Sequence, residues 1–418
     1  MTKIRIAVQG CCHGELDTVF QKVRQLHSLK PLDLLIILGD FQSIRTKEDM
    51  NYISVPLKYR KMGDFHKYYF NDTCKVPVPV IFISGNHESM KHLMELPYGG
   101  YVAPNMYYLG YSNVIWFKGV RIASISGIFK DWVFETPRLS WKDVELRQLN
   151  NGIGHPKLNI KTLYCVKRID VLPFYLLNNE RGIDIMISHD WPNEIVYHGD
   201  IQRLLKYKPY FRKDINNHQL GSPVNWDLLC RLKPKWWLSA HLHVKYRATV
   251  QHELQEKNSL STKKNENEID LELSDEDENF DKTQSENLIR CNCQTSVTNF
   301  LALDKCAPRR QWIDVIEVEQ DKMHISSQEP TNGDMLNLYW DEEFIKALKY
   351  VQTNKSSLKE LTNNIIKKDS YSLLSETNVL HTYGKYEANL YKVPTYTKGI
   401  QRREQEQTNY FEKNFLNQ

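Results

Sequence analysis

Short apolar runs, each ending at a few polar residues, dominate the first 250 residues of this sequence. Seven runs are typical of β-strands, because they are apolar and bounded by glycine, proline or charge. They are Ile4–Gln9, Leu34–Leu38, Val78–Ser84, Val114–Phe117, Val120–Ser126, Ile183–Ser188 and Trp236–Ala240. Apolar residues at helical spacing from Leu16 to Leu29 predict a parallel strand–helix–strand unit with a right-handed crossover. A hairpin-like turn at 117–120 makes the sheets mixed, so we expect an α/β fold.

Five of these runs end in residues that can bind a metal ion. The segments are Gly10-Cys11-Cys12-His13-Gly14, Gly39-Asp40, Gly85-Asn86-His87-Glu88, Ser188-His189-Asp190 and Ala240-His241-Leu242-His243. Sites in α/β sheets form outside the carboxyl ends of the strands, and glycine there lets the backbone turn sharply. We therefore expect the five segments to converge on one point.

The residue types in these segments suit a site for two metal ions. Imidazole and carboxylate groups bind Zn, Fe and Mn, and an aspartate can bridge two ions. Two such ions, about 3.5–4 Å apart, clamp the attacking and leaving oxygens of a displacement at phosphorus and generate hydroxide near neutral pH. An additional histidine can protonate the departing oxygen. The pattern thus predicts metal-assisted hydrolysis of a phosphoester.

The order C-x-H, GD, GNHE, SHD, H-x-H resembles the calcineurin-like metallophosphoesterase superfamily, whose usual order is D-x-H, GD, GNH(D/E), H, GH-x-H. The resemblance implies a two-sheet β-sandwich flanked by helices, formed by a catalytic domain at residues 1–252. It also implies roles for individual residues. His13, Asp40 and His243 fall on the first-metal positions with Asp40 bridging, Asn86, His189 and His241 on the second-metal positions, and His87 on the position that assists the leaving group.

Cys11 departs from the superfamily pattern, which has aspartate at that position. A thiol is softer than a carboxylate and binds a metal only as thiolate. Cys11 could bind a soft ion such as Fe²⁺ or Zn²⁺, or lie outside the coordination shell, or be a small residue at a tight turn. The expected cofactors are two divalent ions, Fe²⁺, Zn²⁺ or Mn²⁺. Ala240, where glycine is usual, is a milder departure.

Longer stretches resemble the RNA lariat debranching enzymes, a family within that superfamily. They include GCCHGELD (10–17), GDFQSIR (39–45), YGGYVAPN (98–105), SAHLHVK (239–245), TNFLALDKC (298–306) and LYWDEEFIKAL (338–348). The resemblance implies hydrolysis of the 2′-5′ phosphodiester at the branch point of excised intron lariats, by metal-activated hydroxide and without a covalent enzyme intermediate. It implies that the partner is branched RNA and that DNA is not bound. It also implies a location in the nucleus, and the cytoplasm is a further possible location. We expect a monomer.

Residues 129–168 combine basic and aromatic side chains without clear periodicity. Cations neutralise phosphates and aromatic faces stack unpaired bases, and in the family this region resembles the lariat recognition loop. The candidate RNA contacts are Lys130, Trp132, Arg138, Lys142, Arg147, Tyr164, Lys167 and Arg168. The alternative is a solvated loop whose aromatic residues pack back on the body.

Charge and polarity divide the rest of the chain. Lys and Arg outnumber Asp and Glu by 55 to 51, but residues 265–281 hold nine acids, which leaves +13 on the remainder. A basic body fits a polyanionic partner. We expect an acidic disordered linker at 253–290, a smaller C-terminal domain at 291–384 and a polar tail at 385–418. Eight cysteines without a secretory signal indicate a reducing, intracellular environment, and no apolar run predicts a membrane span.

Three other functional classes are alternatives. The first is a metallophosphoesterase with a different substrate, such as a phosphoprotein or a small nucleotide diester. The second is a scaffold that keeps the fold without the chemistry. The third is a plain RNA-binding module, which would have no need for the cluster of His, Asp and Asn residues. Basic and aromatic residues at 129–168 argue against the first class, and a nearly complete set of metal-binding residues argues against the second.

Overall fold

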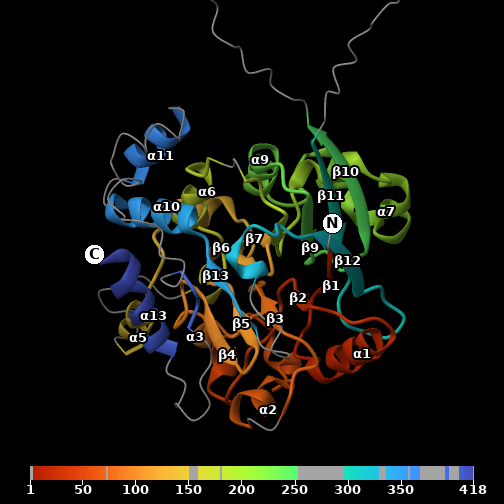
Figure 1. The fold of residues 1–418 in the computed structure, drawn as a ribbon, viewed down its shortest axis with the longest axis horizontal. Helices are drawn as coiled ribbons and strands as arrows, with labels where there is room; N and C mark the ends of the chain where they lie inside the picture. Colours follow the sequence, from red (N-terminus) through yellow and green to blue (C-terminus); the bar gives the residue numbers. More distant parts are fainter. Residues whose placement is uncertain are drawn as a thin grey trace, which may run out of the picture.

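The computed structural model describes most of the chain (Figure 1). The described residues are 3–71, 74–149, 159–178, 181–252, 296–328, 336–355, 358–367, 391–394 and 404–417. The expected acidic linker at 253–290 therefore lies outside the described residues, as does much of the expected tail. In the described part, no helix is long and apolar enough to cross a membrane.

The first sheet has six strands in the order β12-β1-β2-β3-β5-β4. Its strands are β1 (Lys3–Gln9), β2 (Leu34–Ile37), β3 (Val80–Phe82), β4 (Gly100–Ala103), β5 (Met106–Tyr108) and β12 (Ile313–Glu319). β1, β2, β3 and β5 are parallel to one another, and α1 (Leu16–Leu29) connects the first two. The predicted strand–helix–strand unit is confirmed.

The second sheet has seven strands in the order β10-β11-β9-β8-β7-β6-β13. Its strands are β6 (Ser112–Phe117), β7 (Val120–Ile125), β8 (Ile185–Ser188), β9 (Trp236–Ser239), β10 (Tyr246–His252), β11 (Ser296–Ala302) and β13 (Tyr339–Trp340). β6 and β7 form the expected hairpin, with Lys118 and Gly119 in the left-handed region. Both sheets are mixed, because antiparallel strands join a parallel centre.

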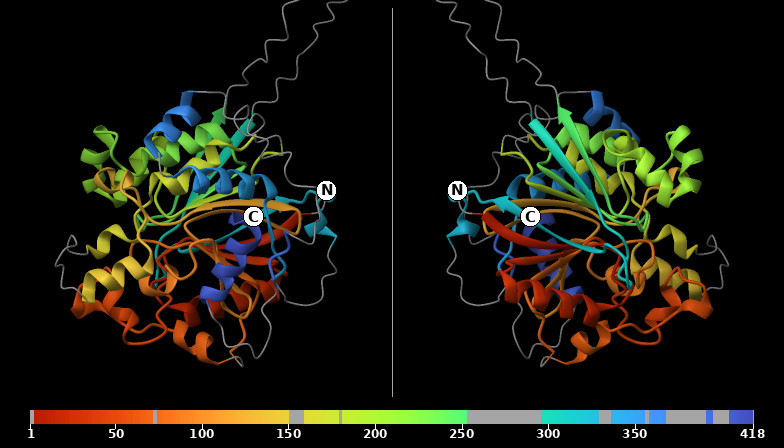
Figure 2. Two further views of the ribbon diagram at one scale, coloured as in Figure 1. Left: turned by 90° about the vertical axis from the view of Figure 1, so that its left-hand side faces the viewer. Right: turned by 90° about the vertical axis from the view of Figure 1, so that its right-hand side faces the viewer.

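Alternating side chains of β1 show how the layers are built. Ile4, Ile6 and Val8 enter the large core that the second sheet shares, whereas Ala7 points to a separate cluster with α1. A strand that is apolar on both faces is typical of a sheet covered on both sides. Figure 2 shows the two sheets as stacked layers with helices outside them, so the expected α/β sandwich flanked by helices is confirmed.

The helices cover the outer faces of the two sheets. The α-helices besides α1 are α2 (Phe65–Phe70), α3 (Met90–Leu93), α4 (Asp131–Phe134), α5 (Trp141–Leu149), α6 (Arg168–Tyr175), α7 (Ile201–Tyr207), α8 (Arg212–Asn216), α9 (Pro223–Leu232), α10 (Glu342–Thr353), α11 (Leu358–Lys367) and α13 (Glu404–Phe411). α6, α9 and α10 contribute buried residues to the large core.

The C-terminal part of the chain contributes strands to both sheets. β11 lies between β9 and β10, β12 pairs with β1, and β13 pairs with β6. We expected a smaller region that packs against the catalytic domain. In the structure its strands extend the catalytic sheets, so the two parts share one hydrophobic core.

Part of the expected polar tail is folded. α13 and the turn after it bury Phe411 and Phe415 against Trp340, with ring centroids 5.3 and 5.2 Å from the indole. Expecting a frayed tail is therefore wrong for residues 404–416. The local sequence is mostly polar, so its few buried aromatic residues did not indicate a helix.

A buried ion pair ties β7 to the start of α10. The Arg121 side chain is 2% exposed, and its Nε and one terminal nitrogen donate to the two carboxylate oxygens of Asp341 at 2.9 and 2.8 Å. Asp341 also accepts from Trp116 Nε1 at 2.8 Å and from the Phe344 backbone N–H at 2.9 Å, which caps α10. This carboxylate thus links three elements.

We predict that Arg121→Met lowers the free energy of unfolding by about 3–5 kcal/mol, because it leaves the Asp341 charge buried without its cation. Urea unfolding of the purified protein measures this loss. Arg24→Met is the control, since Arg24 is exposed and its hydrogen bond to the Lys75 carbonyl lies at the surface. Equal stability of the two variants would contradict the prediction.

Candidate metal centre

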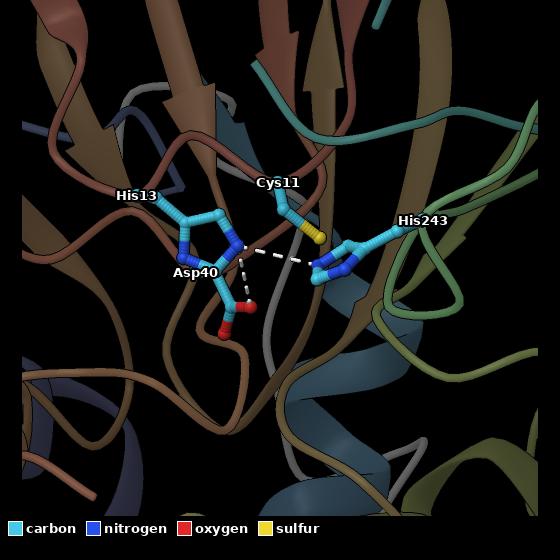
Figure 3. A group of neighbouring side chains, drawn as sticks. All are labelled: Cys11, His13, Asp40 and His243. Carbon is cyan, nitrogen blue, oxygen red and sulfur yellow. Dashed lines mark hydrogen bonds and ion pairs between the residues drawn. The ribbon is translucent and has the colours of Figure 1, made fainter. Parts of the chain in front are cut away.

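Residues from distant parts of the chain meet where the two sheets join. Figure 3 shows Cys11, His13, Asp40 and His243 facing one another. A ligand atom from each lies within 4.8 Å of those of the others. β1 and β2 supply the first three residues and the segment between β9 and β10 supplies the fourth, each just beyond a carboxyl end. The predicted convergence is confirmed for this group.

Nitrogen and oxygen atoms of this group lie close together. Nε2 of His13 lies 3.2 Å from Nε2 of His243 and 3.6 Å from Oδ2 of Asp40. Two imidazole nitrogens and a carboxylate oxygen therefore share one small space. Such a donor set suits a divalent transition metal.

A second group of predicted ligands lies on the other side of Asp40. Nε2 of His189 is 3.5 Å from Asp40 Oδ1, and the rings of His189 and His241 have centroids 5.1 Å apart. The two oxygens of Asp40 thus face different histidine groups. This is the arrangement that a carboxylate bridging two ions requires.

The buried atoms of these residues fit bound cations. Asp40 Oδ2, Asn86 Oδ1 and His189 Nε2 are buried and, within the described part of the chain, accept no hydrogen bond. Leaving such groups without partners costs about 1–3 kcal/mol each. Metal ions coordinated by these three atoms would remove that cost, so the donor set fits the expected two-metal site.

Electrostatics keep the candidate ligands in the form that binds metal. Burial lowers the pKa of His241 to about 4 and that of His243 to about 3, and it also lowers the pKa of His13 and His189. These imidazoles are therefore neutral at physiological pH. Burial opposes ionisation of Asp40, but the surrounding histidines outweigh it and the pKa of the carboxyl is lowered.

Hydrogen bonds to backbone carbonyls orient two of the imidazoles. His189 Nδ1 lies 2.6 Å from the Leu38 carbonyl oxygen and His87 Nδ1 lies 3.1 Å from that of Ser54. A carbonyl only accepts, so each Nδ1 carries a hydrogen, and in His189 this leaves the lone pair on Nε2. The His87 backbone N–H also donates to Asp40 Oδ1 at 2.8 Å.

The backbone at the site is strained. His13, Asp40, His241 and His243 all have positive φ, between 45° and 62°, a region that costs energy for residues with a Cβ. Glycine permits the close approach of the segments: a Cβ on Gly85 would lie 2.3 Å from Asp40 Oδ1. The site geometry therefore depends on the surrounding fold to hold it.

Glu88 is one residue whose role the sequence analysis missed. Its buried carboxylate accepts from the backbone N–H groups of Phe41 and Gln42, the latter at 2.7 Å, and from that of Gly85 at 3.3 Å. Burial raises the pKa of Glu88 to about 8, with the charge of Asp40 adding to the shift. Glu88 fastens the Asp40 loop to the GNHE loop, and its place in the GNHE motif was the available signal.

Cys11 lies inside the first group and is fully buried. Burial raises the pKa of its thiol well above the usual value, and the Asp40 charge adds to the shift. Its carbonyl oxygen accepts from the Cys306 backbone N–H at 2.8 Å, so the C-terminal segment holds the loop in place. Proximity to His13 and His243 is compatible with a thiolate ligand to a bound metal.

Three predicted RNA contacts in 129–168 hold that segment together. Arg138 pairs with Asp170 and stacks over Tyr111, 3.7 Å from the ring centroid. Lys167 is buried and its Nζ donates to Thr136 Oγ1 at 2.6 Å. Tyr164 is buried in a local cluster. These contacts give Arg138, Lys167 and Tyr164 a structural role, and RNA contact by the three residues stays a prediction.

Other candidates in the segment reach solvent. Lys130 and Lys142 are exposed, and Trp132 is 62% exposed despite its large apolar ring. Arg168 pairs with Glu135 and lies over the Phe134 ring. The side chain of Arg147 lies outside the described residues. Lys130, Trp132 and Lys142 stay predicted RNA contacts.

Comparisons with known proteins agree with this geometry. Residues 4–245 match the family model of the calcineurin-like phosphoesterases, and residues 295–414 match the C-terminal domain of lariat debranching enzymes. The chain is 48% identical to the lariat debranching enzyme of Saccharomyces cerevisiae over the full length of both proteins. It is 39% identical to the human lariat debranching enzyme over 76% of this chain and 50% of that protein, and 40% identical to the Schizosaccharomyces pombe enzyme over 76% and 73%. This chain belongs to the lariat debranching enzyme family of calcineurin-like phosphoesterases.

Proposed function

We propose that this protein hydrolyses the 2′-5′ phosphodiester bond at the branch point of intron lariat RNA. The observation that carries the proposal is the position of Asp40, whose two carboxylate oxygens face two separate histidine groups. Family membership supports branched RNA as the substrate. Linearisation of the lariat then allows turnover of the intron.

Two divalent ions bound by Cys11, His13, Asp40, Asn86, His189, His241 and His243 would supply activated hydroxide and stabilise charge on the phosphate. Fe²⁺, Zn²⁺ and Mn²⁺ all suit these donors. The buried unpartnered atoms of Asp40, Asn86 and His189 support such coordination.

His87 is the proposed general acid. The Ser54 carbonyl holds its Nδ1, which leaves Nε2 to carry a proton toward the departing 2′-oxygen. Its ring centroid lies 5.7 Å from that of His13, at the edge of the first histidine group. Proton transfer restores the 2′-hydroxyl of the branch nucleotide, and the released strand keeps a 5′-phosphate.

A hollow beside His87 offers room for RNA. It has a volume of about 760 Å³, and its lining includes Ser54, Arg60, Asn159 and Lys161. Ser54 is the residue that orients His87, so this hollow adjoins the catalytic position. Cations and amide groups there suit a phosphate backbone, which supports a role for the 129–168 segment in branch recognition. We also propose a nuclear location and a monomeric state.

We predict that the purified protein cleaves a branched 2′-5′ RNA and leaves a linear 3′-5′ RNA of the same sequence intact. Products are separated by gel electrophoresis, with a strand bearing a 5′-phosphate as the expected new species. Removing metal with a chelator abolishes turnover, and adding back Mn²⁺, Fe²⁺ or Zn²⁺ restores it. Cleavage that survives complete metal removal, or that favours the linear RNA, would refute the proposal.

His87→Ala should lower kcat on branched RNA by about 10²–10⁴-fold, as expected for loss of a general acid. The same variant should lose far less activity on bis(4-nitrophenyl) phosphate, because a nitrophenolate departs without protonation. Metal content, measured by elemental analysis, should stay at the wild-type level. Equal losses on both substrates would assign His87 another role.

Cys11→Asp should shift metal selection toward Mn²⁺, because a carboxylate is harder than a thiolate. The metal content after equilibration with equal amounts of Mn²⁺ and Zn²⁺ measures this shift. Cys12→Ala serves as the matched control, since Cys12 is buried in the separate cluster with α1. An unchanged Mn-to-Zn ratio in Cys11→Asp would place Cys11 outside the coordination shell.

A further inference from the structure

We infer that a basic groove between α7 and residues 304–311 binds one single-stranded arm of the branched RNA. The groove has a volume of about 930 Å³. Figure 1 shows α7 beside β10, at the end of the molecule away from α10 and α11. Its lining residues are Asp200, Arg203, Leu204, Tyr207, Val244, Lys245, Tyr246, Arg247, Asp304, Pro308, Arg309, Arg310 and Gln311. The inference rests on the proposed function, since it names where a strand of that substrate runs.

Two arginines of the groove are available for phosphate. Neither Arg203 nor Arg309 has an acidic partner among the described residues, and both side chains are exposed. Arg309 has a φ of 60°, a left-handed conformation that is uncommon for arginine. Asp200 caps α7 by accepting from the Arg203 backbone N–H at 2.8 Å, and its carboxylate forms no ion pair with the Arg203 side chain.

The other charges of the groove leave a positive excess. Lys245 and Arg247 share the single carboxylate of Asp314, at 2.9 and 2.6 Å. Arg310 pairs with Asp304 at 2.9 Å. Together with Arg203 and Arg309, five cations thus face three carboxylates, those of Asp200, Asp304 and Asp314, so the groove attracts a polyanion.

The groove adjoins the metal centre through neighbouring residues of the chain. Val244 in its wall follows His243, and Asp304 precedes Lys305. The backbone N–H of Cys306 donates to the carbonyl oxygen of Cys11 at 2.8 Å, so the chain just beyond Asp304 touches the first group of candidate ligands. A strand leaving the reacting phosphate on this side would therefore enter the groove directly.

This route differs from the 129–168 segment. The 129–168 segment contacts the second histidine group, because the Phe129 backbone N–H donates to Oδ2 of Asp190, the residue after His189, at 3.3 Å. The wall at 304–311 contacts the first group, through the hydrogen bond from Cys306 to Cys11. A branched RNA has three strands that leave one nucleotide in different directions, so a second binding surface on the opposite side of the centre suits it. Tyr207, 64% exposed in the groove wall, offers a face for base stacking.

The test compares branched RNA with long arms and branched RNA trimmed to single nucleotides around the branch. The groove predicts that the wild-type protein has a lower KM for the long-armed substrate. Arg203→Glu and Arg309→Glu should each raise that KM roughly tenfold. Each should also reduce the slope of log binding constant against log salt concentration by about 0.7 per lost phosphate contact. Tyr207→Ala should weaken binding of the long-armed RNA by about tenfold, while Tyr207→Phe should not.

Lys206→Glu is the matched control, because exposed Lys206 lies on the same helix but does not line the groove. The inference fails if Lys206→Glu raises KM as much as Arg203→Glu does. It also fails if both arginine variants keep the wild-type preference for long arms. If the wild-type protein cleaves neither branched substrate, the proposed function itself fails, and that result is distinct from loss of arm preference.

Discussion

A buried carboxylate between two groups of neutral imidazoles is the interaction on which the rest of this structure depends. Asp40 lies within 3.6 Å of His13 on one side and 3.5 Å of His189 on the other, and its Oδ2 has no hydrogen-bond partner among the described residues. A buried charge of this kind is costly unless a cation balances it. The negative charge of Asp40 would be balanced by bound divalent ions. The proposed chemistry uses those ions.

The two sheets hold the strained loops of the site in position. Strands of the first sheet supply His13, Asp40 and Asn86, and strands of the second supply His189 and His241, all at carboxyl ends. Four candidate ligands have left-handed backbone conformations, which local sequence preference opposes. Glu88 resists relaxation of these loops by binding three backbone N–H groups at once. The large shared core provides the rigidity that the loops lack.

The C-terminal segment completes the site as well as the fold. β11 separates β9 from β10, so the strand that follows His243 would lose its neighbour without it. The Cys306 backbone N–H binds the Cys11 carbonyl, and Gly10 donates to the Trp312 carbonyl at 2.9 Å. Residues 304–311 also form a wall of the basic groove. Metal binding, strand pairing and the proposed RNA path therefore depend on the same segment.

The sequence alone determined the seven apolar strands, the helix at 16–29 and the residue types at the strand ends, because these signals are local and periodic. It also indicated the candidate metal ligands, since their motifs follow the strands directly. Tertiary structure alone decided that β11 joins the second sheet and β12 the first, because strand pairing joins residues that are far apart in the chain. It likewise decided that Arg138 and Lys167 are held by Asp170 and Thr136 while Arg203 and Arg309 remain available. A basic residue looks the same in a sequence whether a distant carboxylate neutralises it or not, so only the folded chain separates the two cases.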